Sequence, residues 1–222
     1  MSPLPIEVIP TPLGRLVDPL TWWFVIGGQA VRCLCPYRPS RDVDFGVGTV
    51  RHVDDLVAQL EWSGASEILE RPADTVHLRW NRINVSVCML DMLVPFTEER
   101  LLSVRGILAT KLHAILDRGT RRDFFDLYVT LQTQRLGVAE ALAAIRDVYR
   151  QPVRDTLLLR ALTFFDDAER EARLPGEGRG DWRNVKTFFQ SRAGALLIPP
   201  PRALEIQKER VDVRPRSRRR TR

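Results

Sequence analysis

One stretch, from Phe24 to Val47, constrains the fold of this chain more than any other part of its sequence. It reads FVIGGQAVRCLCPYRPSRDVDFGV: an apolar run leads into a glycine pair, an amphipathic segment, a loop with prolines and a second apolar run. This order predicts a strand over residues 22–26, a glycine turn, a helix over residues 29–34, a loop and a second strand over residues 43–47.

The spacing of Asp42 and Asp44 carries the chemistry of this stretch. Side chains alternate between the two faces of a strand, so both carboxylates point the same way while Val43 and Phe45 point into the core. Two convergent carboxylates pack poorly, but they are good ligands for a hard, octahedral cation. We therefore predict that Asp42 and Asp44 bind Mg²⁺ or Mn²⁺.

The glycine pair and the loop predict a phosphate site beside these carboxylates. Gly27 and Gly28 leave no side chain where a triphosphate can approach the backbone, and the following helix offers free N–H groups. Ser40 and Arg41 add a hydroxyl group and a positive charge. These four residues are predicted to bind a nucleotide. A glycine hairpin beside a solvent-facing strand with two acids is the alternative interpretation.

The rest of the hydrophobic pattern predicts further strands followed by helices. The expected strands cover residues 67–71, 76–80 and 83–90, and the expected helical segments cover 52–63, 98–102, 104–117, 121–134, 136–150, 153–171 and 182–197. Pro95 stands where the composition changes to helical. We predict an α+β fold with an α/β domain over residues 1–94, a helical domain over 95–198 that completes the site, and a Pro/Arg-rich tail over 199–222.

The segment KLHAILDRGTRRDFFDL, which begins at Lys111, is the second informative stretch. Lys111 lies on an otherwise apolar helix and Asp123 lies at the start of the next, so a tight turn brings both to one end of the helix pair. The ammonium group neutralises triphosphate charge, and the carboxylate orients the lysine or binds a hydroxyl group. Asp126, one turn further on, caps the helix or pairs with an arginine. A helix pair with surface ion pairs is the alternative.

Together these motifs resemble the polymerase-beta-like nucleotidyltransferase superfamily, and more closely its AbiEii/AbiGii toxin family. The pair GG followed by SRDVDF is similar to the first family signature, and K-x-x-A-x-x-x-R-x-x-x-R-D-x-x-D-L is similar to the second. The resemblance covers about residues 20–135. It implies a nucleotidyltransferase-like mixed sheet with flanking helices, followed by a C-terminal helical bundle, and the catalytic residues Asp42, Asp44, Lys111 and Asp123. Lys111 is also implied to contact the nucleotide.

The activity that this resemblance implies is metal-dependent transfer of a nucleoside monophosphate from an NTP to an acceptor. The family also implies the toxin of a type IV toxin–antitoxin system, with an antitoxin partner and tRNA as an acceptor in some members. Residues 214–222 hold six arginines and no acid, which suits an RNA acceptor. The other 28 of the 34 basic residues are balanced by 28 acidic ones. A solubilising or vector-derived end explains the tail equally well.

One position departs from the family pattern. A third carboxylate is expected on the strand INVSVCML, but the polar positions in phase there are Asn84 and Ser86. Either Asp91 replaces it from a shifted position, or the site uses two aspartates, or the activity is lost. In the last case the chain is a catalytically silent protein of this fold that binds a nucleotide, nucleic acid or a partner. A kinase-like phosphotransferase is a further alternative.

The remaining features predict a cytoplasmic protein without a membrane partner. No apolar run approaches the roughly 20 residues that span a bilayer, and the N-terminus lacks the pattern of a signal peptide. The cysteines are interpreted as buried or incidental thiols in a reducing cytoplasm, and they are Cys33, Cys35 and Cys88. The histidines are interpreted as structural or surface residues rather than zinc ligands, and they are His52, His77 and His113.

Overall fold

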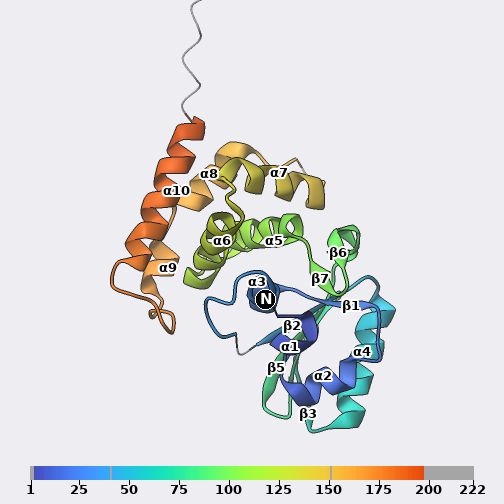
Figure 1. Ribbon diagram of the computed structural model, residues 1–222. Helices are drawn as coiled ribbons and strands as arrows, with labels where there is room; N and C mark the ends of the chain where they lie inside the picture. The colour runs from blue at the N-terminus through green and yellow to red at the C-terminus, as the bar shows by residue number, and fades with distance from the viewer. Residues whose placement is uncertain (1–2, 41, 151, 198–222) are drawn as a thin grey trace, which may run out of the picture.

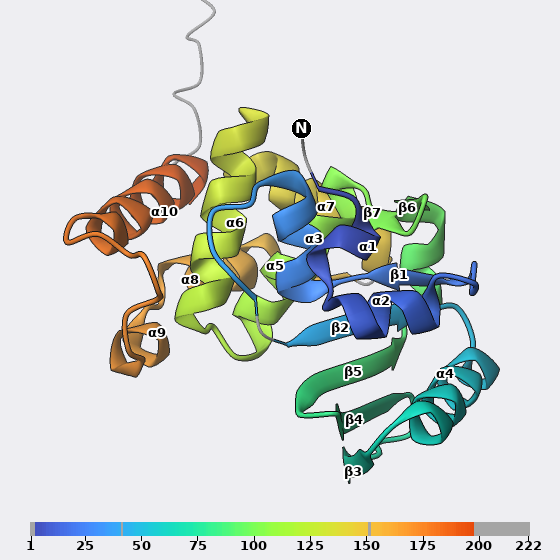
Figure 2. The same cartoon turned by 60° about the horizontal axis from the view of Figure 1, so that its bottom comes forward.

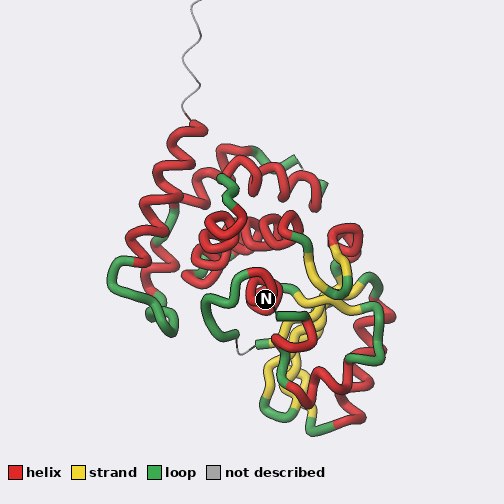
Figure 3. Tube along the Cα trace, viewed as in Figure 1, coloured by secondary structure: helices red, strands yellow, loops and turns green. Residues whose placement is uncertain are grey.

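The computed structural model describes residues 3–40, 42–150 and 152–197, with a sheet in one half and helices in the other (Figure 1). Arg41 and the tail over residues 199–222, both named in the predictions above, lie outside the described residues. Figure 3 shows the strands gathered on one side of the molecule and the longer C-terminal helices on the other.

Seven strands form one mixed sheet in the order β3-β4-β5-β2-β1-β7-β6. They are β1 (Trp23–Val25), β2 (Val43–Val47), β3 (Ser66–Glu70), β4 (Thr75–Trp80), β5 (Ile83–Met89), β6 (Thr97–Glu98) and β7 (Leu101–Leu102). Strand β2 runs antiparallel to β1 and parallel to β5. The predicted α+β class with a mixed sheet and flanking helices is therefore confirmed.

The period-two pattern of β2 separates a buried face of the sheet from a polar one. Val43, Phe45 and Val47 are fully buried on one face. Helix α4 (Val50–Ser63) covers this face, and the Trp80 indole donates a hydrogen bond to the Leu60 carbonyl at 2.9 Å. In Figure 2, α4 lies beside β4 and β5. The opposite face is left to carry the polar residues of these strands.

The first 20 residues form an N-terminal arm with two short helices. They are α1 (Pro5–Val8) and α2 (Thr11–Val17). Leu13 and Val17 of α2 are fully buried, and the Trp23 indole donates to the Val17 carbonyl at 2.7 Å. This packing, together with that bond, fixes the arm against the first strand.

The segment over residues 98–102 was predicted to be helical, and this prediction is wrong. Thr97–Glu98 and Leu101–Leu102 pair as an antiparallel hairpin, and Val25 of β1 pairs with Leu101 in parallel. Glu99 and Arg100 have φ angles of +47° and +66°, which form a tight hairpin turn and are incompatible with a right-handed helix. The sheet therefore continues beyond residue 95, where the helical domain was predicted to begin.

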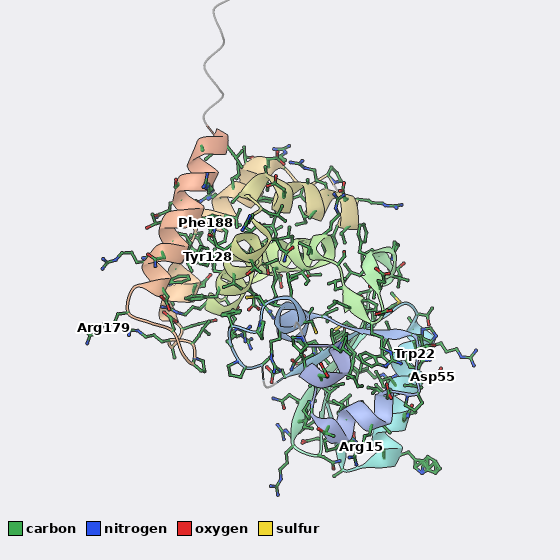
Figure 4. All side chains as sticks on the ribbon, in the orientation of Figure 1. Arg15, Trp22, Asp55, Tyr128, Arg179 and Phe188 are labelled. Carbon is green, nitrogen blue, oxygen red and sulfur yellow. The ribbon has the colours of Figure 1, made fainter. Side chains whose placement is uncertain are left out.

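The helical half contains α5 (Val104–Asp117) and α6 (Arg121–Gln134), which have the predicted bounds. It continues with α7 (Val138–Tyr149), α8 (Asp155–Thr163), α9 (Asp166–Arg170) and α10 (Asp181–Leu197). The single helix predicted over residues 153–171 is divided, because the chain becomes extended at Phe164 and turns the buried Phe165 onto Phe124. Tyr128 and Phe188 pack together between α6 and α10, with ring centroids 5.3 Å apart (Figure 4).

Helix α3 (Gly27–Leu34) joins the two halves of the molecule. It follows β1 directly and packs against β2, α5 and α6 (Figure 2). The N-terminus of α3 therefore lies where the polar face of the sheet meets the helical half. No helix within the described ranges is long and apolar enough to cross a membrane.

Candidate active site

A cavity of about 290 Å³ lies between the polar face of the sheet and the adjoining ends of α5 and α6. Seven predicted site residues line it: Gly27, Gly28, Ser40, Asp42, Asp44, Lys111 and Asp123. The eighth, Arg41, lies outside the described residues. The structure therefore brings residues from both sequence motifs to one space, although they are far apart in the chain.

The glycine pair is required by the close approach of the strand and the loop. Gly27 has a φ angle of +60°, and a Cβ atom there would lie 2.4 Å from Oδ2 of Asp44. A Cβ atom on Gly28 would lie 2.8 Å from Oγ of Ser40. Gln29 donates from Nε2 to the Ser40 and Asp42 carbonyls at 3.3 and 3.1 Å. The start of α3 thus determines where Asp42 and Asp44 lie.

Asp42 lies at the entrance to β2 and keeps much of its carboxylate accessible. Its side chain is 42% exposed, Asn84 donates from Nδ2 to its Oδ1 at 3.2 Å, and Nη1 of Arg122 lies 3.5 Å from its Oδ2. Such half-exposed contacts bind the carboxylate weakly. Asp42 is therefore available for a further ligand.

Asp44 is an acid whose charge the protein does not fully neutralise. Burial raises the pKa of Asp44 above its ordinary value, and the negative charge of Asp42 raises it further. A hydrogen bond from Ser86 and the positive charge of Lys111 act in the opposite direction without cancelling the rise. A carboxylate whose ionised form is disfavoured gains most from a cation placed beside it.

The donor set fits a magnesium ion that completes its coordination with substrate. In the part of the chain that the structure describes, no group of three or more His, Cys, Asp or Glu side chains could hold a metal. Mg²⁺ is commonly held by one or two carboxylates, with phosphate oxygens and water as the other ligands. Asp42 and Asp44, which both line the cavity, would supply that pair of carboxylates.

Lys111 forms a buried ion cluster on the helical wall of the cavity. Its Nζ lies 2.7 Å from Oδ2 of Asp126 and 3.4 Å from Oδ1 of Asp123, and all three side chains are at most 6% exposed. Arg118 and Thr120 also donate to Asp123, at 2.9 and 2.5 Å. Burial favours a raised pKa for Asp123, but Lys111, Arg118 and Thr120 together lower that pKa to about 2. Asp123 is therefore held as an anion.

Asp126 connects this cluster to the loop before β2. Arg38 donates from Nη2 to both of its carboxylate oxygens at 2.8 Å, and the Tyr37 hydroxyl donates to Oδ1 at 2.5 Å. The sequence predicted that Asp126 caps the helix or pairs with an arginine, and the pair with Arg38 is the one formed. Because the same carboxylate also binds Lys111, it ties the loop, α5 and α6 together.

Comparison with protein families identifies the class of this chain. The family model "Nucleotidyl transferase AbiEii toxin, Type IV TA system" matches residues 73–194, which is more than half of the chain. The chain belongs to the AbiEii family. The resemblance found in the sequence is confirmed. The first motif lies before the matched range, so the positions of Gly27 and Asp44 relative to the second motif come from the geometry above.

Individual relatives of this AbiEii chain are distant. It is 26% identical over 93 residues to the uncharacterised protein aq_aa25 of Aquifex aeolicus (strain VF5), a match covering 42% of the chain and 44% of that protein. Among solved structures, ANT(2")-Ia in complex with adenylyl-2"-tobramycin has a TM-score of 0.49 at 11% identity, covering 62% of this chain and 93% of that one. JHP933 from Helicobacter pylori has a TM-score of 0.47 at 15% identity, covering 84% and 91%.

The position of the expected third AbiEii carboxylate is occupied by Ser86, which pairs with Asp44 across β2 and β5. Asp91 does not replace it. Asp91 begins the 3₁₀ helix η1 (Asp91–Phe96) beyond the far end of β5, accepts a hydrogen bond from its neighbour's amide, and does not line the cavity. Of the alternatives left open by the sequence, two acids or a silent site remain.

The sequence predictions missed several residues that line the cavity. His77, interpreted from the sequence as structural or surface, lies in it beside Ser86, and so do Asn84, Arg118 and Arg122. The two-residue turn at Asn81 and Arg82 is a sequence signal from which the position of His77 could have been predicted. Because such a turn fixes the register of a hairpin, it places His77 opposite Ser86.

Proposed function

We propose that this chain is a metal-dependent nucleotidyltransferase that moves a nucleoside monophosphate from an NTP to an acceptor and releases pyrophosphate. The observation that carries the proposal is the single cavity with Asp42 and Asp44 on one wall and Lys111, Arg118 and Arg122 on the other. Paired carboxylates facing a group of cations suit a cation-bound triphosphate better than they suit a neutral ligand.

The size of the cavity favours the triphosphate over the whole nucleotide. Its volume of about 290 Å³ is near the lower limit of ligand sites, which is roughly 300 Å³. The phosphates are expected inside, where the open start of α3 and Ser40 offer donors, and the nucleoside is expected to extend over the rim. Mg²⁺ held by Asp42 and Asp44 would supply positive charge that orients the phosphates and stabilises the leaving pyrophosphate.

The helical wall supports the same reaction through position as well as charge. Lys111 is already paired with Asp123 and Asp126, so it brings a held ammonium group rather than a freely mobile cation. Both Arg118 and Arg122 are roughly half exposed. Arg122 is free to turn toward phosphate oxygens, whereas Arg118 is held by two hydrogen bonds to Asp123. In this arrangement Asp123 acts by holding Lys111 and Arg118 in place.

For the acceptor we propose RNA, with tRNA as the first candidate, and for the biological role the toxin of a type IV toxin–antitoxin pair. The basic tail of the sequence and the family assignment support both. A cognate antitoxin is the implied protein partner. A reducing cytoplasm suits the free thiols of Cys33, Cys35 and Cys88.

A second candidate function is a catalytically silent binder of nucleotide, nucleic acid or protein. The observation that favours it is Ser86, a residue without a carboxylate at the place where the family pattern has a third acid. The loss of this acid affects proton transfer more than it affects nucleotide binding.

The test is incubation with each α-labelled NTP, Mg²⁺ and total tRNA, followed by measurement of label on the RNA and of pyrophosphate. Asp44→Asn should lower label transfer by at least about 10²- to 10³-fold, because it removes a negative ligand of the cation that orients the reacting phosphates. It should leave the free energy of unfolding unchanged or higher, since burial disfavours the Asp44 charge. Asp91→Asn is the matched control and should transfer label normally.

The other outcomes separate the alternatives. NTP binding to the wild-type chain without label transfer would support the silent binder. In a parallel incubation with γ-labelled ATP, release of ADP together with label on the acceptor would instead identify a phosphotransferase.

A further inference from the structure

Polar residues line up across four strands on the face of the sheet that forms the cavity. In the strand register, Glu70 of β3 pairs with His77 of β4, His77 with Ser86 of β5, and Ser86 with Asp44 of β2. Paired residues on neighbouring strands share a face of the sheet. His77 therefore belongs to the same row as the predicted metal ligand Asp44, two strands away from it.

Ser86 contacts one of the two nitrogens of the His77 ring. Nδ1 of His77 lies 3.0 Å from Oγ of Ser86, and the Ser86 hydroxyl also bonds to the carboxylate of Asp44. When Oγ of Ser86 accepts from Nδ1–H, the other nitrogen of the neutral ring carries no proton. A neutral imidazole with a proton on Nδ1 has its lone pair on Nε2.

Nε2 of His77 is the ring nitrogen that Ser86 does not contact. Among residues 3–40, 42–150 and 152–197, no group forms a hydrogen bond with this nitrogen, while the His77 side chain lines the cavity and is half-buried. A half-buried acceptor nitrogen at the wall of a reaction cavity is positioned to receive a proton from a bound hydroxyl group.

The acids of the cavity are less suited to that task. Asp123 is held ionised by Lys111, Arg118 and Thr120, which lower its pKa to about 2. Both oxygens of Asp126 accept hydrogen bonds from Arg38. The remaining two acids are the pair that binds the cation in the proposed function. Among the described residues that line the cavity, His77 is therefore the one basic side chain that is not already bound in an ion pair.

Resting on the proposed function, we propose that His77 is the general base of the transfer and supplies what the missing third carboxylate would supply. Nε2 takes the proton of the acceptor hydroxyl as the hydroxyl oxygen bonds to the α-phosphorus. The bond from that phosphorus to the bridging oxygen breaks, and its electron pair leaves with pyrophosphate. The imidazolium then returns its proton to water. Ser86 and Asp44 act as positioning residues for the imidazole.

The test compares two substitutions of His77 in the labelled-NTP and total-tRNA assay. His77→Gln keeps an amide N–H that can reach Ser86 but has no basic nitrogen, and His77→Ala leaves space for added imidazole. Both should lower label transfer by about 10²-fold or more while the thermal shift caused by NTP with Mg²⁺ is kept. Added imidazole should restore transfer by His77→Ala in proportion to its concentration. A purely structural role would not produce this rescue.

His113 and His52 provide matched controls, because each stacks on an aromatic ring outside the cavity, Tyr149 and Trp22 respectively. Their Ala variants should transfer label at the wild-type rate and should not respond to imidazole. Wild-type rates from both His77 variants, without imidazole dependence, would overturn the role of His77 and leave the nucleotidyltransferase intact. Absence of transfer by the wild-type chain would overturn the proposed function and the base together.

Discussion

The two walls of the cavity carry charge in opposite ways. On the sheet wall, Asp42 and Asp44 are half-buried, and their partners are either partly exposed or too weak to cancel the rise in the pKa of Asp44. On the helical wall, Lys111, Asp123 and Asp126 are buried and paired with one another. The sheet wall carries carboxylate charge that the protein does not fully neutralise, whereas the helical wall is already neutralised by the protein.

From this difference we expect the sheet wall to bind the ligand and the helical wall to stabilise the fold. A buried ion pair costs desolvation energy and returns it only when both partners are present. Removing one member of the helical cluster should therefore destabilise the fold. Removing a carboxylate from the sheet wall relieves like-charge repulsion and should affect the ligand instead. We therefore expect the second motif of the sequence to stabilise the fold as well as to serve the proposed reaction.

The largest expected effect is that of Asp126→Ala, which tests whether the helical wall supports the fold. The substitution leaves Lys111 and Arg38 without their shared carboxylate, and a charge deprived of its buried partner costs about 3–5 kcal/mol. Urea denaturation should show this loss in the free energy of unfolding. Asp155→Ala, which removes an exposed pair with Arg146, should cost less than about 1 kcal/mol.

If Asp126→Ala does not fold, the isosteric Asp126→Asn should fold with a smaller loss, because the amide oxygen still accepts from Arg38. Equal and small losses for the Asp126 and Asp155 variants would contradict the proposed division between the walls.

A second, smaller effect is expected on the free energy of unfolding at low pH. The pKa of Asp123 is lowered to about 2, so the stability that Asp123 contributes is present above its ordinary value of 3.8 and is lost as pH falls toward 2. Lowering the pKa of Asp123 from 3.8 to about 2 corresponds to about 2 kcal/mol of stability. The difference in free energy of unfolding between the wild type and Asp123→Asn should therefore shrink by about that amount between pH 5 and pH 2. A difference that stays constant over this range would show that the lysine and arginine do not stabilise the anion.

Sequence reasoning found the site best where local periodicity determines the position of a residue. Alternation along β2 was enough to place Asp42 and Asp44 on one face, and helical spacing gave the bounds of α5 and α6. The glycine pair was also predictable, because only glycine allows the approach that the structure shows at Gly27. Each of these features depends on a few neighbouring residues.

The parts that were missed depend on contacts between distant segments. The bidentate pair of Arg38 with Asp126 spans 88 positions, and no local pattern distinguishes it from a solvated arginine. Residues 98–102, which belong to the hairpin of β6 and β7, were predicted to be helical because two-residue strands are too short to show alternation. His77 requires the pairing of three strands before its row with Ser86 and Asp44 can be seen.

The smallest change in stability is expected for Arg122→Ala. Its effect is to be compared with that of Arg38→Ala, because both arginines line the same cavity. Arg122 is 46% exposed and lies 3.5 Å from Asp42, whereas the Arg38 side chain is 8% exposed and bound bidentately to Asp126. Arg122→Ala should change the free energy of unfolding by less than about 1 kcal/mol but weaken NTP binding several-fold, more at low than at high salt. Arg38→Ala should instead destabilise the fold. Titration of each variant with NTP and Mg²⁺, alongside urea denaturation, separates the two effects. If Arg122→Ala destabilised the chain as much as Arg38→Ala, the exposed arginine would belong to the supporting wall and the division drawn above would not hold.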